Sequence, residues 1–420
     1  MTMKTLTKIL KYVVLPLLIV IVGILFYISI GFGKLDFKDD FNVKEDFSAF
    51  YPESYEQARE DFRALSASLS ERFENVTYCP LWVSSEVDND LTIDICYIPA
   101  QNDSLNLLIL VSGVHGVEGY VGHAVQKMFV DNYLDNEMVE NTGVLLIHAV
   151  NPYGFKYTRR VTENNVDMNR NSPSTPDLYD IRNEGYTQVY DLINPQKKVR
   201  TRSLENRFFF VKAINEIRKA SLPVLRQAVL QGQYTYPEGL YFGGKAPEPQ
   251  IEVLEPVIAR ISQPYNRIMV LDLHTGYGER GKLHLFPNPM EDNERERLEY
   301  MFEGFSIDWG DTEDFYTVTG DFVSFVGALN PEKEFYPMVF EYGTLNSQTT
   351  MGSLKSIHIM ILENQGHQHG YASARDSIRV KADLLEMYYP ASENWRNYSM
   401  QQTRDVLDVV LPRFSSADMD

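Results

Sequence analysis

The sequence predicts an α/β fold in which a mixed, largely parallel central sheet is flanked by helices and preceded by one N-terminal transmembrane helix. Several short apolar runs end in glycine or polar residues, as expected of strands that are buried on both faces of a sheet. Stretches with helical spacing of apolar residues separate these runs. One long uncharged apolar run lies close to the N-terminus.

Composition and charge restrict the class of protein. The chain has 420 residues, of which 44% are hydrophobic and 12% aromatic, so it can bury a large core. Its formal net charge is -19 at pH 7. A nucleic-acid ligand would require a basic face, so we expect none. We also expect no nucleotide, because the glycine-rich residues 240–249 lack the spacing and the Ser or Thr of a phosphate-binding loop.

The uncharged apolar run covers residues 12–32 and is long enough to cross the hydrocarbon core of a membrane as a helix. Three lysines precede it, whereas the flank behind it mixes lysine with aspartate. The positive-inside rule therefore predicts a cytoplasmic N-terminus and an extracytoplasmic remainder, in the periplasm or at the cell exterior. A cleaved signal peptide is the alternative, but the run is long and no small-x-small cleavage site follows it.

The predicted organisation has two parts. Residues 1–40 contain a cytoplasmic stub, the anchor and a linker, and residues 41–420 form a single domain. Within that domain, the polar, proline-containing residues 172–207 predict a long surface excursion. The remaining pattern predicts strands at residues 105–113, 143–154, 266–276 and 337–344, and helices at residues 54–73, 119–134, 206–231, 357–364, 372–387 and 401–411.

The only two cysteines, Cys79 and Cys96, flank a polar turn in a segment that predicts a β-hairpin. Folded in this way, the two side chains would face each other. An exported domain would permit a disulfide between them, but two unpaired buried thiols fit the pattern equally well.

Residues that can bind a metal lie where the predicted buried strands end, which is the edge at which open α/β sheets place their sites. His115 and Glu118 lie in VHGVEG, just after the first of these strands, and His274 ends another in LDLHTG. Imidazole nitrogen and carboxylate oxygen suit Zn²⁺, and three protein ligands with one open position are typical of a catalytic zinc site. A loop salt bridge and a hydrogen-bonded strand-end imidazole are the alternatives.

Two further segments carry polar residues of interest. Glu341 in VFEYGT closes a predicted strand with a carboxylate between apolar residues, where a raised pKa would suit a general base; a structural ion pair is the alternative. Asp167, Asn169 and Arg170 are closely spaced in residues 159–171. Arginine and asparagine can bind a carboxylate through directed hydrogen bonds, although a basic surface loop would have the same composition.

Four motifs occur in the order VHGVEG, NPYGFKYTRRVTENNVDMNRN, DLHTG and FEYGT. In content and order they resemble the zinc carboxypeptidases of the carboxypeptidase A kind, more closely an uncharacterised bacterial branch related to the succinylglutamate desuccinylase and aspartoacylase group. The resemblance covers roughly residues 54–411 and implies that residues 41–420 form a zinc carboxypeptidase-like catalytic domain.

The resemblance also implies a role for each matching residue. One Zn²⁺ per chain would be held by His115, Glu118 and His274, and Glu341 would activate the metal-bound water. The other matches are Arg160 for polarising the scissile carbonyl, Asn169 and Arg170 for gripping the terminal carboxylate of the substrate, Asp167 for orienting the first zinc histidine, and Tyr316 for capping the substrate.

These residues together predict a zinc metallopeptidase, most simply a metallocarboxypeptidase that acts on an extracytoplasmic peptide with a free C-terminal carboxylate. An N-acyl amino acid deacylase of the succinylglutamate desuccinylase or aspartoacylase type would use the same zinc site. A membrane-tethered binding module that retains zinc or a peptide without chemistry is a third hypothesis, and the presence of Glu341 argues against it.

Overall fold

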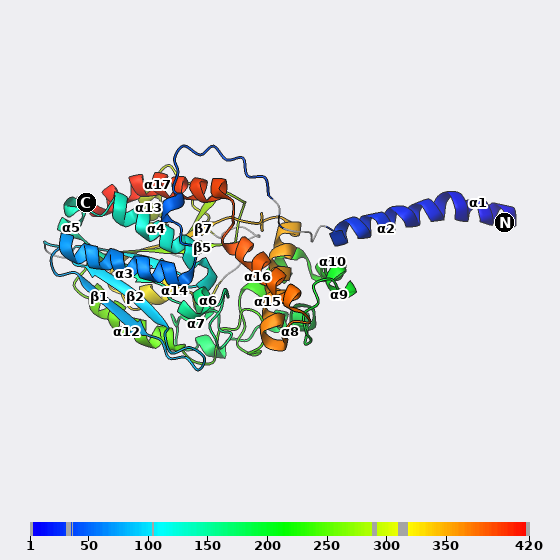
Figure 1. Cartoon of the computed structure of the whole chain (residues 1–420), viewed down its shortest axis with the longest axis horizontal. Helices are drawn as coiled ribbons and strands as arrows, with labels where there is room; N and C mark the ends of the chain where they lie inside the picture. The colour runs from blue at the N-terminus through cyan, green and yellow to red at the C-terminus, as the bar shows by residue number, and fades with distance from the viewer. Residues whose placement is uncertain are drawn as a thin grey trace.

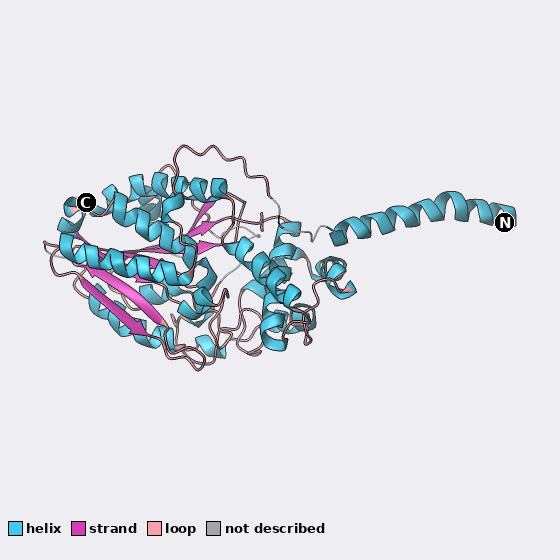
Figure 2. Ribbon diagram, viewed as in Figure 1, coloured by secondary structure: helices cyan, strands magenta, loops and turns pink. Residues whose placement is uncertain are grey.

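The structure, a computed structural model, describes residues 3–30, 35, 37–102, 105–287, 292–309 and 318–416. Tyr316, the expected substrate-capping residue, lies outside the described residues. A long N-terminal helix projects from an α/β body in which helices surround one sheet (Figures 1 and 2).

The sheet has seven strands in the order β1-β2-β4-β3-β5-β7-β6 within the described part of the chain. Parallel pairing joins the four central strands, β4, β3, β5 and β7. Antiparallel pairing adds β1 and β2 at one edge and β6 at the other. The predicted mixed sheet is therefore confirmed, with its parallel part at the centre. The strands are β1 (Thr77–Trp82), β2 (Thr92–Ile98), β3 (Asn106–Ser112), β4 (Thr142–His148), β5 (Arg267–Thr275), β6 (Leu283–Phe286) and β7 (Glu334–Tyr342).

Successive side chains of the central strands point to opposite faces of the sheet, so the core is divided between the two faces. On β3, Leu108 and Leu110 belong to one apolar cluster, whereas Leu107 and Ile109 belong to another. The first cluster is covered by α3 (Tyr55–Arg72), α4 (Gly119–Asn132), α13 (Asp292–Met301) and α17 (Glu393–Ser415), and the second by α12 (Pro249–Ser262) and α14 (Phe322–Ala328). Because both faces are covered, the central strands are apolar at nearly every position.

A third apolar cluster lies beyond the carboxyl end of the sheet. It is formed mainly by five helices: α8 (Glu184–Ile193), α10 (Phe209–Ala220), α11 (Leu222–Leu230), α15 (Thr350–His369) and α16 (Ala374–Tyr388). The single helix expected at residues 206–231 is divided between α10 and α11. Ser221 has a φ of +70°, which no helix accommodates, and Pro223 starts the next helix.

Short helices complete the described elements. They are η2 (Ser48–Phe50), η3 (Gly116–Glu118), α5 (Asn136–Asn141), α6 (Pro152–Lys156), α7 (Met168–Asn171), η4 (Leu178–Asp180) and α9 (Leu204–Arg207). The segment before α3 is tied to α17, because the backbone N–H groups of Phe41 and Phe47 donate to the side chains of Asn394 and Asn397. The segment from Phe41 onward is thus part of the folded body.

The two cysteines do not face each other, which corrects that expectation. The hairpin pairs Cys79 with Ile95 and Tyr78 with Cys96. An offset of one residue turns the side chains to opposite faces of the sheet. Cys96 is buried in the first core cluster, Cys79 packs against the second, and both thiols are free.

The N-terminal helix comprises α1 (Met3–Ile9), a π-helical turn η1 (Leu10–Val14) and α2 (Leu15–Ile30). The 20 residues Thr7–Phe26 have a mean hydropathy of 2.7, and none of that apolar stretch is buried against the protein. The helix is therefore long and apolar enough to cross a membrane, a property it shares with signal sequences. It starts five residues before the expected run, and the last residues of that run, 31 and 32, lie outside the described residues.

Candidate metal centre

Three buried side chains converge beyond the carboxyl ends of β3 and β5. The Nδ1 atoms of His115 and His274 lie 2.9 Å from the two carboxylate oxygens of Glu118, and 3.1 Å from each other. One ligand atom from each residue lies within 4.8 Å of the others. Ligands of a tetrahedral zinc at 2.0–2.1 Å are roughly 3.3 Å apart. The three groups therefore have the spacing and chemistry of a three-ligand zinc site with one open position.

The loop after β3 sets the geometry of its two ligands. His115 precedes η3 and Glu118 ends it, so one tight turn brings the two side chains together. A Cβ on Gly116 would lie 2.2 Å from the backbone carbon of Gly154, so only glycine fits this approach to α6. The amide of Gly116 also donates to the carbonyl oxygen of Arg160 at 3.1 Å. The glycine in VHGVEG is thus required for the close packing of the loop.

His274 reaches the same point from the end of β5. The backbone N–H of Thr275 donates to Oε2 of Glu118 at 2.9 Å, which ties the strand end to the η3 turn. In the parallel register, the residues that end β3 and β5 lie side by side, with Ser112 opposite Leu273. The strand ends thus bring His115, Glu118 and His274 to one point.

A second carboxylate lies behind each histidine. Nε2 of His115 lies 3.1 Å from Oδ1 of Asp167, and Nε2 of His274 lies 2.8 Å from Oδ2 of Asp272. A carboxylate at Nε2 fixes the ring and leaves Nδ1 as the nitrogen that faces the centre, the arrangement that metal-binding histidines commonly have. Asp272 was missed in the sequence, although its position two residues before His274 places it on the same strand face.

Charge reinforces this arrangement. Burial opposes ionisation of Asp167, but the charges of Arg160 and His115 outweigh it and hold the pKa of Asp167 well below its usual range. Burial likewise opposes ionisation of Glu118, and the adjacent His115 and His274 lower its pKa. Both carboxylates are therefore anionic, which suits a site for a divalent cation.

Glu341 lies on β7 directly opposite His274 of β5 in the parallel register. One carboxylate oxygen accepts a hydrogen bond from the backbone N–H of Tyr277 at 2.8 Å. Its side chain is only half-buried and lines the same cavity as the two histidines. Burial and the negative charge of Glu118 raise its pKa, so this carboxylate has an increased affinity for a proton.

Most of the chain matches one protein family. Residues 51–402 match the family described as "Protein of unknown function (DUF2817)". The chain belongs to this family. No curated protein matches the sequence.

Solved structures similar to this DUF2817 chain include a metallo-carboxypeptidase from Pseudomonas aeruginosa in complex with (2-guanidinoethylmercapto)succinic acid. It is 14% identical, with a TM-score of 0.37, and the match covers 73% of this chain and 69% of that one. Carboxypeptidase A from Helicoverpa armigera is 15% identical, with a TM-score of 0.38 and coverages of 79% and 73%. A putative metallopeptidase from Shewanella denitrificans is 15% identical, with a TM-score of 0.34 and coverages of 80% and 100%.

Arg160 and Asn169 lie beside the metal ligands of the DUF2817 chain. Nη1 of Arg160 lies 3.5 Å from Glu118, and both Nε and Nη2 contact Oδ2 of Asp167 at 3.1 Å. Nδ2 of Asn169 lies 3.3 Å from Nε2 of His274, while its Oδ1 accepts from the backbone N–H of Phe322. Both residues line the cavity, as expected of groups that contact a substrate.

Arg170 is buried and is held by backbone carbonyls. Its Nε donates to Leu230 at 3.1 Å and its Nη1 to Asn169 at 2.8 Å. The guanidinium groups of Arg160 and Arg170 lie 5.4 Å and 5.7 Å from the ring centre of Tyr241. Arg170 still lines the cavity, so its expected carboxylate-binding role stays a prediction.

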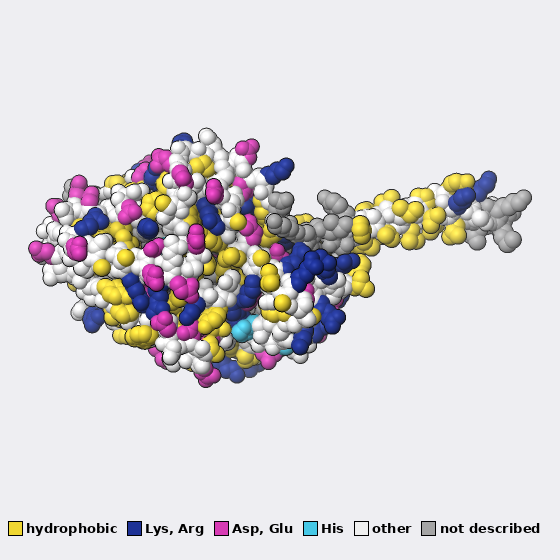
Figure 3. All heavy atoms as spheres, viewed as in Figure 1, with side chains coloured by type: hydrophobic (Ala, Val, Ile, Leu, Met, Phe, Trp, Pro, Cys, Tyr) yellow, Lys and Arg dark blue, Asp and Glu magenta, His cyan; other side chains and the backbone are white. Residues whose placement is uncertain are grey.

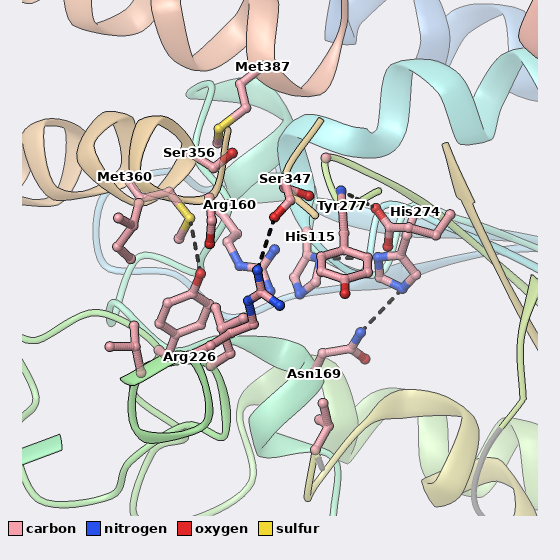
Figure 4. Close-up of a pocket in the computed structure, with 18 of the residues that line it drawn as sticks. His115, Arg160, Asn169, Arg226, His274, Tyr277, Ser347, Ser356, Met360 and Met387 are labelled. Carbon is pink, nitrogen blue, oxygen red and sulfur yellow. Dashed lines mark hydrogen bonds between the residues drawn. The ribbon is translucent and has the colours of Figure 1, made fainter. Parts of the chain in front are cut away.

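One cavity of about 420 Å³ is bordered by His115, His274, Glu341, Arg160, Asn169 and Arg170. Figure 4 shows His115, His274 and Tyr277 at one end, Arg160 and Arg226 in the middle, and Met360 with Met387 at the other end. Arg226 is a further cation of the site, contributed by α11, and its Nη2 lies 3.5 Å from the backbone oxygen of Ser347. The sequence analysis did not identify it, because α11 lies in the helix expected at residues 206–231, which carries none of the four motifs.

Proposed function

We propose that this protein is a zinc-dependent hydrolase that cleaves the amide bond preceding a terminal residue with a free carboxylate, as a metallocarboxypeptidase does. The observation that carries this proposal is the convergence of His115, Glu118 and His274 within 4.8 Å of one another. Glu341 and Arg160 border the same cavity, so an acid-base group and a cation are available beside the centre.

The chemistry divides between the metal and the chain. A zinc ion held by the three ligands supplies a Lewis acid that polarises a carbonyl group and makes water more acidic. Glu341 accepts a proton from the attacking water and later donates it to the leaving amine as the C–N bond breaks. Arg160 donates to the carbonyl oxygen as negative charge develops there. The products are a carboxylic acid and an amine, and water is consumed.

Asn169 and Arg170 would recognise the terminal carboxylate. Asn169 can donate from Nδ2 on the cavity side, and Arg170 supplies a permanent positive charge nearby. This recognition would restrict cleavage to the last bond of a chain. A peptide and an N-acyl amino acid both carry such a carboxylate. Deacylation of an N-acyl amino acid is therefore the second candidate function.

We further propose that the helix from Thr7 to Phe26 anchors the enzyme in a membrane, with the catalytic domain on the extracytoplasmic side. The length and hydropathy of the helix support anchoring. The lysines that precede it support the orientation through the positive-inside rule. Substrates would then be peptides or acyl amino acids outside the cytoplasm.

Metal analysis combined with hydrolysis tests the proposed function. The full-length chain, purified in detergent, is expected to hold about one zinc per chain and to release a terminal amino acid from a panel of peptides and acyl amino acids. His274→Ala is expected to lose the zinc. Glu341→Gln is expected to keep it and to lose hydrolysis by at least about 10²-fold. A wild-type protein that binds no zinc after reconstitution would refute the proposal and favour a binding module.

A further inference from the structure

We propose that the cavity beside the metal centre holds a long aliphatic chain, so that the preferred substrate is an amino acid N-acylated by a fatty acid. The inference rests on the proposed function and names the substrate class of that site.

The far end of the cavity is an apolar chamber. Its wall comes from α8, α10, α11, α15 and α16, and includes Val189, Phe209, Ala213, Leu225, Ile357 and Met360. Most of these side chains are buried in the third apolar cluster. The chamber opens into the space around His115 and His274, because both sets of residues line the same cavity. A chain bound there would extend away from the scissile bond.

The chamber offers few partners to a peptide backbone. The hydroxyl groups of Tyr241 and Tyr388 are both directed at the sulfur of Met360, at 3.4 Å and 3.3 Å. The other polar side chains on the helices of this wall are those of Glu216, Arg226, Ser353 and Ser356. A peptide bond placed among apolar walls would lose its hydrogen bonds to water without replacing them. An aliphatic chain has no such groups and gains from the transfer.

The middle of the cavity is cationic. Arg226 and Leu225 are neighbours on α11, so the same helix contributes a guanidinium group to the middle and an apolar side chain to the chamber. Figure 4 shows Arg226 beside Arg160, between the methionines and His274. An amphiphile with one carboxylate and one apolar tail matches this division of charge and apolar surface.

The outer face of α9, α10 and α11 adjoins the N-terminal helix, since α10 contacts α2. Exposed basic residues gather there in a chain that is acidic overall (Figure 3). They include Arg207, Lys212, Arg218 and Lys219. Leu204, Phe208 and Val224 are exposed on the same elements by 70%, 40% and 57%. Exposed apolar side chains among basic ones favour contact with the headgroup region of a membrane. The wall of the chamber is therefore the part of the body nearest the bilayer from which an amphiphile would come.

The test is a chain-length series. Full-length protein in lipid nanodiscs is given N-acyl amino acids that share one amino acid and range from acetyl to hexadecanoyl, and the released amino acid is measured. We expect kcat/KM to rise roughly fourfold per methylene over the shorter chains, the factor that corresponds to about 0.8 kcal/mol. In parallel, binding of the same series to Glu341→Gln is measured by calorimetry.

Ala213→Phe should fill the chamber and abolish the preference for long chains, so that kcat/KM no longer rises along the series. Ala213→Leu should shorten the preferred chain by a smaller amount, which keeps the test informative if the larger side chain prevents folding. Ala67→Phe is the matched control, because Ala67 is exposed on α3, away from the cavity.

The outcomes separate the two proposals. Hydrolysis that is independent of chain length, or a preference for unmodified peptides, would refute acyl-chain binding in the chamber and would leave the proposed hydrolysis unaffected. Binding that rises with chain length and is lost in Ala213→Phe, without hydrolysis of any member by the zinc-loaded wild type, would support the chamber and refute the reaction.

Discussion

The carboxylate of Asp272 lies 2.8 Å from Nε2 of His274, its neighbour two positions along β5. Successive side chains alternate across a strand, so these two residues share one face of the sheet. Burial opposes a positive charge on His274, but Asp272 and Glu118 outweigh it and raise its pKa well above the usual value. Asp272 therefore fixes the ring so that Nδ1 points at Glu118.

From this relationship we expect Asp272→Asn to weaken zinc binding by roughly 10- to 100-fold without unfolding the protein. Competition with a chromophoric chelator measures the change. Asp308→Asn is the matched control, because Asp308 pairs with Nδ1 of His284, which is not a metal ligand. Equal zinc affinity in wild type and Asp272→Asn would show that the ring needs no such support.

Gly116→Ala should damage both stability and metal binding. The added Cβ would lie 2.2 Å from the backbone carbon of Gly154, so the η3 turn that carries Glu118 must shift. Overpacking of this kind costs about 1–3 kcal/mol or more. Chemical denaturation and zinc analysis measure the two effects. Gly327→Ala, in the interior of α14, serves as control. The nearest atom to its added Cβ would be a ring atom of the Phe335 side chain, at 3.0 Å, and not a backbone atom. A neutral effect of Gly116→Ala would contradict the packing argument.

The fold and the convergence of the candidate metal ligands could be predicted because their signals are local. Each ligand follows a buried strand, and parallel strands bring their carboxyl ends to one edge. The expected Cys79 to Cys96 contact failed because a polar turn does not fix register, and an offset of one residue reverses the face of a side chain. Arg226 could not be predicted, since only the packing of α11 against α8 and α10 brings it to the cavity.

Acid sensitivity is expected from Glu363. Burial opposes its ionisation, but Arg159 and Lys381 outweigh it and lower its pKa from 4.5 to about 2. Arg159 lies 3.0 Å and Lys381 2.8 Å from its Oε1. As the pH falls, the Glu363 carboxyl group therefore takes up its proton at a higher pH in the unfolded chain than in the folded one. The stabilisation is complete above about pH 4.5 and is lost progressively between pH 4.5 and pH 2.

Glu363→Gln should accordingly lower the free energy of unfolding at pH 7 by about 3 kcal/mol, because it leaves the buried Arg159 and the half-buried Lys381 without their carboxylate partner. The variant should also lose less stability than wild type between pH 5 and pH 3. Denaturant titrations at the two pH values measure this difference. The exposed Glu332→Gln is the control. If wild type and Glu363→Gln lost the same free energy of unfolding between pH 5 and pH 3, other carboxylates would be responsible for the acid sensitivity.

The two thiols should react separately and need no reductant. Cys96 is buried, and burial raises its pKa to about 11, whereas Cys79 is half-buried. Alkylation of the native protein should therefore modify Cys79 first, and unfolding in the absence of reductant should expose both. Intact mass and peptide mapping follow the two sites. A second alkylation that appears only after reduction would show a disulfide and a different hairpin register.

The orientation of the N-terminal helix can be tested with single cysteines placed on either side of it. In a chain whose own cysteines are replaced by serine, Val87→Cys lies on a loop position that is 66% exposed, and Thr5→Cys lies just before the apolar stretch Thr7–Phe26. If the positive-inside rule holds, a membrane-impermeant maleimide added to spheroplasts should label Val87→Cys and spare Thr5→Cys until the cells are lysed. Both variants should also remain in the membrane after alkaline extraction, because a spanning helix resists it. Labelling of Thr5→Cys from outside would invert the topology. Release of Val87→Cys with a shortened N-terminus would identify the helix as a cleaved signal sequence.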